Sequence, residues 1–305
     1  MTAPVEMARP RAVEWPTALL AAVVYGGWLA LTWYHAALPW WLLAPLGGWF
    51  VAWHSSLQHE IVHGHFTPWQ GLNRAIAYPP LMLWMPYARY RATHLQHHRN
   101  EFLTLANVDP ESRYWLAADL AALGPIGRAL ARAEMTMLGR VTVGPVWVSL
   151  RFLWCEARAI AAGDREIAAA WLWHLPGVAA VLAWVTLVCG MSALSYIVLF
   201  ALPGTALMLI RSFAEHRAVP DVDRRTVVVE NTPVFALLYL NNNLHATHHL
   251  TPGLAWYLLP EFHKESRALL EQRGVRFYRG YAEVFRRYLL RPHDQLVHPF
   301  QSQAP

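Results

Sequence analysis

Two long stretches of the sequence contain no charged side chain. Residues 15–59 and residues 167–210 carry no Asp, Glu, Lys or Arg. One helix needs about 20 apolar residues to cross the hydrocarbon core of a bilayer, so each stretch can hold two such helices and a turn. The turns are visible as Ala-Ala-Leu-Pro at residues 36–39 and Cys-Gly-Met-Ser at residues 189–192. The pattern therefore predicts four transmembrane helices arranged as two hairpins. The expected spans are residues 16–35, 39–58, 168–188 and 192–211.

The polar parts of the chain lie outside these two hairpins. Neither hairpin turn carries a cation, whereas the connection between the hairpins and the C-terminal part carry almost all of the arginines. By the positive-inside rule these cationic parts lie in the cytoplasm, together with both termini. We therefore expect an all-α integral membrane protein with a cytosolic helical cap over residues 59–166 and 212–305. We expect residues 1–305 to form a single domain in a bacterial inner membrane.

Three further segments have a recognisable pattern. The apolar runs at residues 75–88 and 232–244 are too short to span a bilayer, so we expect them at the membrane interface. Residues 261–290 are rich in charge, with Leu, Phe and Tyr at helical spacing. This pattern predicts one or two amphipathic cytosolic helices.

The composition agrees with a membrane protein and excludes several other classes. Hydrophobic residues make up 55% of the chain and charged residues 15%, against roughly a quarter charged in an average soluble domain. The two cysteines, Cys155 and Cys189, exclude a disulfide framework, a zinc ribbon and an iron–sulfur cluster. The sequence pI is about 9.4, yet no basic stripe or RNA-binding motif is present, so we expect no nucleic-acid partner.

Histidine is the most informative residue type in this chain, which contains 16 of them. Three clusters share the spacings i, i+3 and i+4, which place side chains on one helical face with Cβ atoms about 5–6 Å apart. The clusters are His59 with His63, His94 with His97 and His98, and His245 with His248 and His249. Each cluster can present two or three imidazoles to one point, and imidazole is a good ligand for iron, copper, zinc and nickel.

The predicted topology brings these clusters to one face of the membrane. The first cluster follows the second span, the second lies in the connection after it, and the third follows the fourth span. His216 lies just beyond the end of that fourth span. One metal ion binds about four to six ligands, so nine imidazoles are too many for a single metal. The sequence therefore predicts two metals, with positions left open for oxygen or water.

Two other interpretations of the histidines are possible. The segment His59-Glu60-x-x-His63 also matches the H-E-x-x-H pattern, in which two histidines bind zinc and the glutamate is a general base. A membrane zinc metalloprotease would need only one more ligand, however, and would leave six clustered histidines unused. A non-catalytic membrane protein with a structural histidine cluster is the third possibility. We expect core or capping roles for six of the other histidines, which are His35, His54, His174, His263, His293 and His298.

The order of the boxes, H-x-x-x-H, H-x-x-H-H and H-x-x-H-H with helical hairpins between them, resembles the membrane fatty acid desaturase superfamily. The resemblance covers roughly residues 15–260, and relatives of this superfamily include alkane hydroxylases and carotenoid ketolases. It implies a non-haem centre of two Fe²⁺ ions that uses O2 as a co-substrate. The resemblance of Glu215-His216 to the alkane hydroxylases adds His216 to the box histidines as a ligand. The implied ligands are His59, His63, His94, His97, His98, His216, His245, His248 and His249.

The chain is similar to more than one branch of the superfamily. Residues 104–112 resemble a stretch of the alkane hydroxylases, whereas residues 252–257, after the third box, look more like small bacterial desaturases and ketolases. The leading interpretation is desaturation of a long-chain fatty acyl substrate held in the membrane. Hydroxylation of a lipid or alkane, or ketolation of a carotenoid, is the alternative. A cytochrome b5 signature is missing from the sequence, so we expect a separate ferredoxin or rubredoxin-like electron donor.

A metal-ligating histidine is oriented by a partner on its other ring nitrogen. The candidates close to a box are His65, Glu60, Asp109, Glu215 and Asn243. Glu60 lies beside the bilayer, where a carboxylate without a partner would be costly. Asp109 precedes Pro110, so a role as a turn residue is an equal alternative for it.

Overall fold

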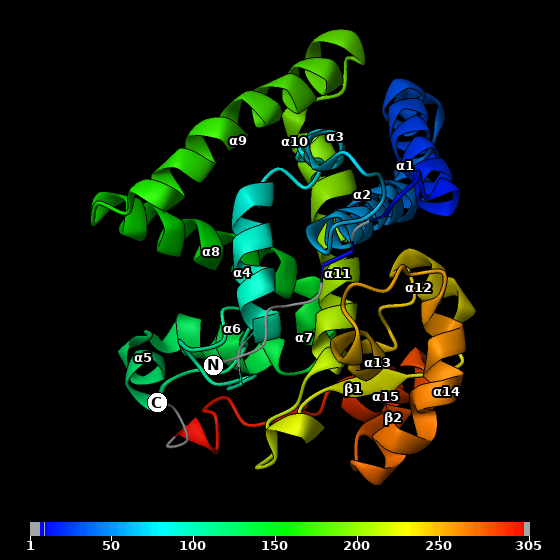
Figure 1. Cartoon of the computed structure of the whole chain (residues 1–305). Coiled ribbons are helices and arrows are strands. Elements are labelled where there is room, and N and C mark those ends of the chain that lie inside the picture. Colours follow the sequence, from blue (N-terminus) through cyan, green and yellow to red (C-terminus); the bar gives the residue numbers. More distant parts are fainter. Residues whose placement is uncertain (1–6, 9, 100, 302–305) are drawn as a thin grey trace. The chain divides into compact units, whose positions relative to one another are not determined.

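The computed structural model describes residues 7–8, 10–99 and 101–301, and it is mostly helical (Figure 1). The predicted cytoplasmic termini, residues 1–6 and 302–305, lie outside the described residues. The chain forms two compact units, each built from separated stretches of sequence. We call residues 10–92 and 145–208 the apolar unit. Residues 7–8, 93–99, 101–144 and 209–301 form the histidine unit. The expected single-domain organisation stays a prediction.

The secondary-structure elements are named in chain order. The helices are α1 Trp15–Trp33, α2 Trp40–Val62, α3 Gln70–Ala77, α4 Tyr87–Arg99, α5 Ala117–Ala122, α6 Pro125–Glu134, α7 Met137–Thr142, α8 Gly144–Ala161, α9 Arg165–Ala183, α10 Ala193–Tyr196, α11 Leu202–Glu215, α12 Pro233–Leu238, α13 His245–Leu250, α14 Leu259–Gln272 and α15 Tyr281–Tyr288. The π-helical segments η2 Trp184–Val188 and η3 Ile197–Ala201 extend α9 and precede α11, respectively. The two strands are β1 Val227–Val229 and β2 Arg276–Tyr278.

Helices α1 and α2 of the apolar unit form the first predicted hairpin. The turn between them is the short 3-10 helix His35–Ala37, and Pro39 is the N-cap of α2. The second predicted turn, at residues 189–192, contains Gly190 with a φ of +71°, a conformation that glycine adopts without a Cβ clash. Both turns therefore lie where the sequence predicts them.

Glycines allow a close approach of α2 and α11. A Cβ built on Gly48 would lie 2.6 Å from the Cβ of Pro203, and a Cβ built on Gly204 would lie 2.6 Å from Cγ1 of Val51. Small residues at a helix–helix contact are the usual means of tight packing in membrane helices. Nearby, Trp28 donates a hydrogen bond of 3.0 Å from Nε1 to the hydroxyl of Tyr196 inside the core of the apolar unit.

Within the described residues, three helical segments are long and apolar enough to cross a membrane. They are Trp15–Trp33, Arg165–Val188 and Ala193–Glu215, and they correspond to three of the four predicted spans. The other predicted span, residues 39–58, is part of α2, which is a helix but is not among the three. Its C-terminal half carries polar residues such as His54, Ser56 and Gln58. The four-span topology stays a prediction.

The histidine unit contains a small sheet that the expected all-α fold does not include. Strands β1 and β2 pair in parallel, with Val227 opposite Arg276 and Val229 opposite Tyr278. All three residues of β1 are valines and all three are buried. Branched side chains of this kind fit the pleated surface of a strand better than a helix, and this explains the correction.

The C-terminal segment forms two helices, where its pattern predicts one or two. Helices α14 and α15 are separated by β2, with Gly274 (φ +73°) before the strand and Gly280 after it. The short apolar runs contain only short helices. Residues 75–88 include the end of α3 and an irregular stretch before α4, and residues 232–244 include α12. Their place at a membrane interface stays a prediction.

Candidate metal centre

The histidine unit brings its box histidines together from three elements. His94, His97 and His98 lie near the C-terminal end of α4, and the third box forms α13. His216 follows the last residue of α11. The ring centroids of His94 and His98 are 4.7 Å apart, and those of His245 and His249 are 4.5 Å apart, because residues four apart lie on one helical face.

Four of these histidines form one set of potential ligands. Each offers a ring nitrogen, and the four atoms all lie within 4.8 Å of one another; the set is His97, His216, His245 and His249. The Nε2 atom of His245 is 2.9 Å from Nε2 of His216 and 3.0 Å from Nε2 of His249. His97 and His245 are almost completely buried. The set therefore offers several ring nitrogens to one small volume that water does not reach freely.

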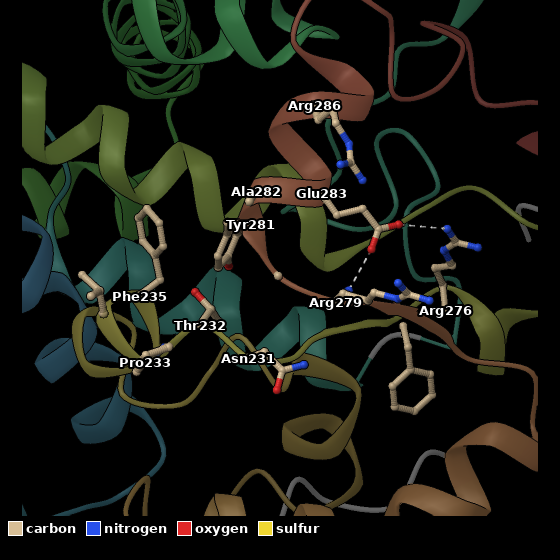
Figure 2. Close-up of a pocket in the computed structure, with 13 residues that line it drawn as sticks. Asn231, Thr232, Pro233, Phe235, Arg276, Arg279, Tyr281, Ala282, Glu283 and Arg286 are labelled. Atoms are coloured by element: carbon tan, nitrogen blue, oxygen red, sulfur yellow. Dashed lines mark hydrogen bonds and ion pairs between the residues drawn. The ribbon is translucent and has the colours of Figure 1, made fainter.

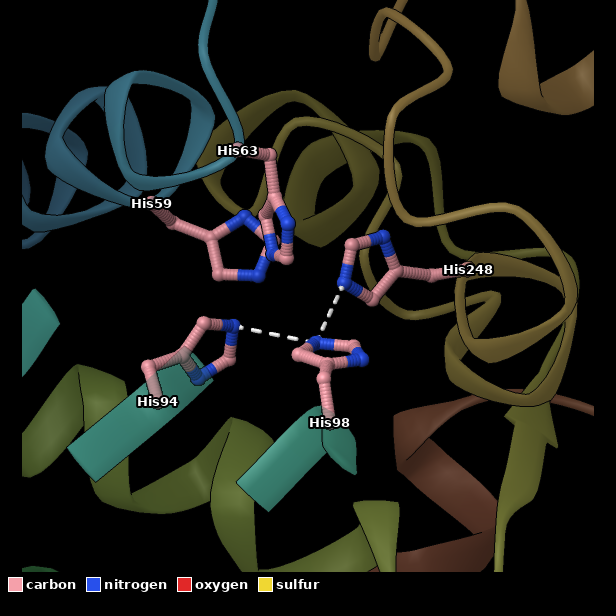
Figure 3. A group of neighbouring side chains, drawn as sticks. All are labelled: His59, His63, His94, His98 and His248. Atoms are coloured by element: carbon pink, nitrogen blue, oxygen red, sulfur yellow. Dashed lines mark hydrogen bonds between the residues drawn. The ribbon is translucent and has the colours of Figure 1, made fainter. Parts of the chain in front are cut away.

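The other three histidines of this unit form a second set. The Nε2 atom of His98 is 3.1 Å from Nε2 of His94 and 3.1 Å from Nε2 of His248 (Figure 3). His94 and His248 are each about 1% exposed. Both sets thus have the same construction, with a central imidazole whose Nε2 atom contacts the Nε2 atoms of two neighbours.

His59 and His63 belong to the apolar unit and are also drawn in Figure 3. His59 lies in the last turn of α2 and His63 is its C-cap, so the H-x-x-x-H spacing places both side chains at one end of the helix. Their ring centroids are 4.8 Å apart. The Oε1 atom of Glu60 lies 3.5 Å from Nδ1 of His59.

Carboxylates hold the Nδ1 atoms of two box histidines. The Nδ1 atom of His97 lies 2.9 Å from Oδ1 of Asp109, and Nδ1 of His94 lies 2.8 Å from Oε1 of Glu111. An ionised carboxylate can only accept a hydrogen bond, so each Nδ1 carries the proton and donates it. The Nε2 atom of each ring is then the nitrogen that can bind a metal, the arrangement found around metal-ligating histidines.

Electrostatics in the histidine unit favour a cation. Burial lowers the pKa of His97, but the charges of Asp109 and Glu111 outweigh it and raise that pKa to about 9. Burial lowers the pKa of His216 to about 3, and burial with the surrounding imidazoles lowers the pKa of His245 and His249 well below the usual range. These last three rings are therefore neutral at pH 7, the state that a metal ligand requires.

Two observations show that these residues are suited to bind a metal. The Nε2 atom of His97 is buried and has no hydrogen-bond partner among the described residues. In addition, the contacts between Nε2 atoms are 2.9–3.1 Å long. Imidazole nitrogens that lie this close together can bind the same metal ion.

The predicted orienting residues have different environments in the structure. Asp109 contacts His97 as described, and Oε1 of Glu215 lies 3.3 Å from Nδ1 of His245 and 2.8 Å from Nε of Arg211. His65 instead bonds Glu14 at the start of α1, with 2.8 Å between Nδ1 and Oε2. This contact attaches the end of α2 to the start of α1.

The orienting role of Asn243 stays a prediction. Its Nδ2 atom donates a hydrogen bond of 2.7 Å to the carbonyl of Val229, because the turn before α13 directs this side chain toward β1. The preceding residue, Asn242, contacts His245 instead, with 3.0 Å between Oδ1 and Nδ1. A neighbouring amide of the same type therefore has the orienting position.

Sequence reasoning also missed Glu111. It lies in the same turn as Asp109, and its backbone N–H donates a hydrogen bond of 3.0 Å to Oδ1 of Asp109. The only sequence signal is a second carboxylate two residues after the first. Charged residues in turns are common, and only the folded turn shows that this one contacts His94.

A pocket of about 790 Å³ lies in the histidine unit, between the start of α12 and the start of α15 (Figure 2). Three arginines line it, Arg276, Arg279 and Arg286, with Glu283 as a counter-charge 3.7 Å from Arg276. Phe235 and Tyr281 form part of an apolar wall, with ring centroids 4.8 Å apart. The pocket therefore combines a cationic edge with an aromatic surface.

Comparison with known proteins identifies a family. The sequence model of a family described as fatty acid desaturase matches residues 36–281, which is more than half of the chain. No curated protein matches the chain. The matched range includes all three histidine boxes and His216.

Proposed function

Because the chain belongs to the fatty acid desaturase family, we propose that it is an O2-dependent di-iron oxidoreductase that desaturates a long-chain fatty acyl substrate in the membrane. Family membership supports an oxidoreductase. The observation that carries the metal assignment is the pair of histidine sets with inward Nε2 atoms 2.9–3.1 Å apart. The Nδ1 atoms of His94, His97 and His245 contact a carboxylate or an amide, the arrangement that prepares imidazoles for a metal.

The proposed ligands divide between two irons. His97, His216, His245 and His249 would hold one iron, on the geometry of the histidine unit. His94, His98 and His248 would hold the other, and we assign His59 and His63 to this second iron on the order of the boxes along the chain. All-imidazole ligation is neutral, and the carboxylates of Asp109 and Glu111 partly balance the charge of the cations.

The irons, when bound, supply the redox chemistry that activates O2 for attack on an unactivated methylene, which no side chain can provide. Desaturation consumes one O2, two electrons and two protons, removes two hydrogens from adjacent carbons, and releases two water molecules. The protein residues hold the imidazoles in one tautomer and exclude water from the ligand atoms. The electrons come, in this proposal, from a separate ferredoxin or rubredoxin-like donor.

The proposal includes a place for the substrate. The pocket of the histidine unit has arginines for an anionic or polar end, and Phe235 and Tyr281 give it an apolar wall. The topology that we propose has four transmembrane helices and places both termini in the cytoplasm. Helix α2 is the fourth of these helices, although it is less apolar than the other three. The acyl chain would then reach the irons from the membrane.

Product and metal analysis test this function. The chain is expressed in a host with defined lipids, and the lipids are analysed by mass spectrometry. We expect a loss of two hydrogens per modified acyl chain, and a gain of one oxygen would instead support the hydroxylase or ketolase alternative. Two irons per purified chain are expected, whereas one zinc and no iron would support the metalloprotease that uses His59, Glu60 and His63.

A matched pair of variants completes the test. His97→Ala removes a proposed ligand, so we expect no product and a loss of iron with the fold retained. His35→Ala changes a histidine in the turn of the first hairpin, where its Nδ1 atom lies 2.8 Å from the carbonyl of Thr32. Product formation and iron content of this control are expected to equal those of the wild type.

A further inference from the structure

The last described residues of the chain contact the loop that follows α4. We call residues 293–301 the C-terminal strap and residues 101–115 the carboxylate loop, because the loop carries Asp109 and Glu111. Both segments belong to the histidine unit. They are separated by nearly two hundred positions in the sequence, and the family match ends at residue 281, before the strap.

A buried histidine attaches the strap to the loop. His298 and Thr104 are each about 2% exposed. The backbone N–H of Phe300 donates a hydrogen bond of 3.1 Å to Nδ1 of His298, so the proton of this ring is on Nε2. The Nε2–H group therefore donates the bond of 2.8 Å to Oγ1 of Thr104. Burial lowers the pKa of His298 to about 4, so the ring is neutral at pH 7.

Thr104 in turn holds the carboxylate of Asp109. Its backbone N–H donates a hydrogen bond of 2.8 Å to Oδ2 of Asp109. The other oxygen, Oδ1, accepts the bond of 2.9 Å from Nδ1 of His97. The four residues that these hydrogen bonds connect are each at most 3% exposed, so water does not compete for the contacts. A continuous series of buried hydrogen bonds thus leads from the strap to a proposed ligand.

A second attachment supports the same part of the loop. The side chain of Gln301 bonds both backbone groups of Ala106, with 3.0 Å from N to Oε1 and 3.1 Å from Nε2 to O. On either side, Thr104 and Asn107 have left-handed φ angles of +72° and +61°. Such conformations are unfavourable for residues other than glycine and persist only where surrounding contacts enforce them. The strap contacts this segment at Thr104, through His298, and at Ala106, through Gln301.

The far end of the loop is attached as well. The N–H of Trp115 donates a hydrogen bond of 2.9 Å to the carbonyl of Leu296 in the strap. The hydroxyl of Tyr114 donates a bond of 2.5 Å to Oδ2 of Asp294. The loop is therefore fixed by the strap before and after the two carboxylates that contact box histidines.

We propose that the C-terminal strap positions the metal centre, with His298 as the positioning residue that fixes Asp109 on His97 through Thr104. This inference rests on the proposed function only in taking His97 as a metal ligand. It predicts that residues outside the family match control how tightly the centre retains its metal.

The test measures metal affinity and loop protection in the full chain in detergent. Co²⁺ is the probe, and its affinity is measured by titration of the metal-free protein. Loss of an outer hydrogen-bond partner typically weakens metal binding 10–100-fold, so we expect His298→Ala to bind Co²⁺ about tenfold more weakly or worse. Hydrogen exchange of the carboxylate loop should accelerate in the same variant. His298→Gln keeps a donor at the same reach and should restore both properties to within a few-fold.

Two further variants make the outcome decisive. Thr104→Val removes the hydroxyl without changing side-chain volume, and it should reproduce the effect of His298→Ala even if that variant folds poorly. Gln295→Ala changes an exposed residue of the strap and is the matched control, with no expected effect. Wild-type affinity and exchange in both His298→Ala and Thr104→Val would overturn the proposal. A wild-type chain that binds no metal would overturn the proposed function, while the exchange data would still show whether the strap holds the loop.

Discussion

At the scale of single residues, the two nitrogens of each imidazole have separate tasks. In His97 and His94 the Nδ1 atom donates a hydrogen bond to a carboxylate, so the Nε2 atom is the one that can bind a metal. The tautomer is therefore fixed by Asp109 and Glu111 before any metal binds. A histidine box without these partners would have to select among ring orientations and tautomers on binding, at a cost in affinity.

Substitution of Asp109 by Asn tests this role. The variant keeps the shape of the side chain but loses the negative charge that favours a cation at His97. We expect iron affinity to fall 10–100-fold, with a parallel loss of product and little change in the unfolding temperature of the metal-free chain. Iron content is measured after dialysis against a weak chelator. Asp223→Asn, at an exposed position of the same unit, is the control, and equal iron retention in both variants would contradict the role of Asp109.

At the scale of elements, the hairpins depend on close contact between α2 and α11. A Cβ on Gly48 would lie 2.6 Å from Cβ of Pro203 and 2.9 Å from its backbone carbon, so the backbone itself would have to move. In a well-packed interior, extra volume of this kind typically costs about 1–3 kcal/mol. The glycines therefore determine how closely the two helices approach.

Gly48→Ala is accordingly expected to destabilise the fold by roughly 1–3 kcal/mol. The measurement is the thermal unfolding of the purified chain in detergent, followed by circular dichroism. Gly26→Ala is a matched control, because the new Cβ at Gly26 in α1 would meet no heavy atom within 4 Å apart from its chain neighbours and the backbone of its own helix. Its unfolding temperature should stay equal or rise, since alanine is the better helix former. An equal loss of stability in both variants would show that the close approach is not the cause.

The sequence predicts the elements well where a buried charge would be costly. It predicts side-chain contacts poorly, because these depend on the conformation of turns in the folded chain. The two charge-free stretches located both hairpin turns, because a charged side chain in hydrocarbon is rarely tolerated. The same reasoning could not show that α2 is less apolar than the other predicted spans, because its C-terminal half combines apolar residues with His54 and Gln58. The sequence does not predict the sheet, because a strand of three valines is too short to show the alternation of apolar and polar residues that is typical of a strand. The box spacing located the histidines, but only the folded turns distinguish Asn242 from Asn243 and show that Glu111 contacts His94.

At the scale of the whole molecule, the proposed activity requires substrate and metal to be held by different sites. The pocket of the histidine unit contains Arg279 and Arg286, which have exposed side chains. If these arginines bind the polar end of the acyl substrate, reversal of their charge should raise KM and leave kcat nearly unchanged. The reason is that they contact a part of the substrate that does not react.

The double variant Arg279→Glu and Arg286→Glu tests this assignment. We expect KM to rise about tenfold or more, which corresponds to about 1.4 kcal/mol of lost binding. Product formation is measured at several substrate concentrations in vesicles. Arg273→Glu changes an exposed arginine at the end of α14, outside the pocket, and should behave like the wild type. A fall in kcat at unchanged KM would place the arginines in another role, such as contact with the electron donor.

Metal removal tests the molecule as a whole, because ligand atoms from separate elements converge without a covalent link. In the metal-free chain, neutral imidazoles such as His216, His245 and His249 present Nε2 atoms to one another at 2.9–3.0 Å. A metal that binds the folded chain but not the unfolded one stabilises it in proportion to the logarithm of its concentration over Kd. Chelation should therefore lower the unfolding temperature, and added Fe²⁺ under anaerobic conditions should restore it.

The same experiment on His97→Ala distinguishes a metal effect from an effect of the chelator on the detergent or lipid. This variant lacks the buried Nε2 atom that has no other hydrogen-bond partner among the described residues, so it should lose most of the response to Fe²⁺. Its unfolding temperature should lie near that of the metal-free wild type. If the wild type and His97→Ala respond equally to chelation, the stabilising metal is bound elsewhere, and the convergence of the histidine boxes has no part in holding the fold together.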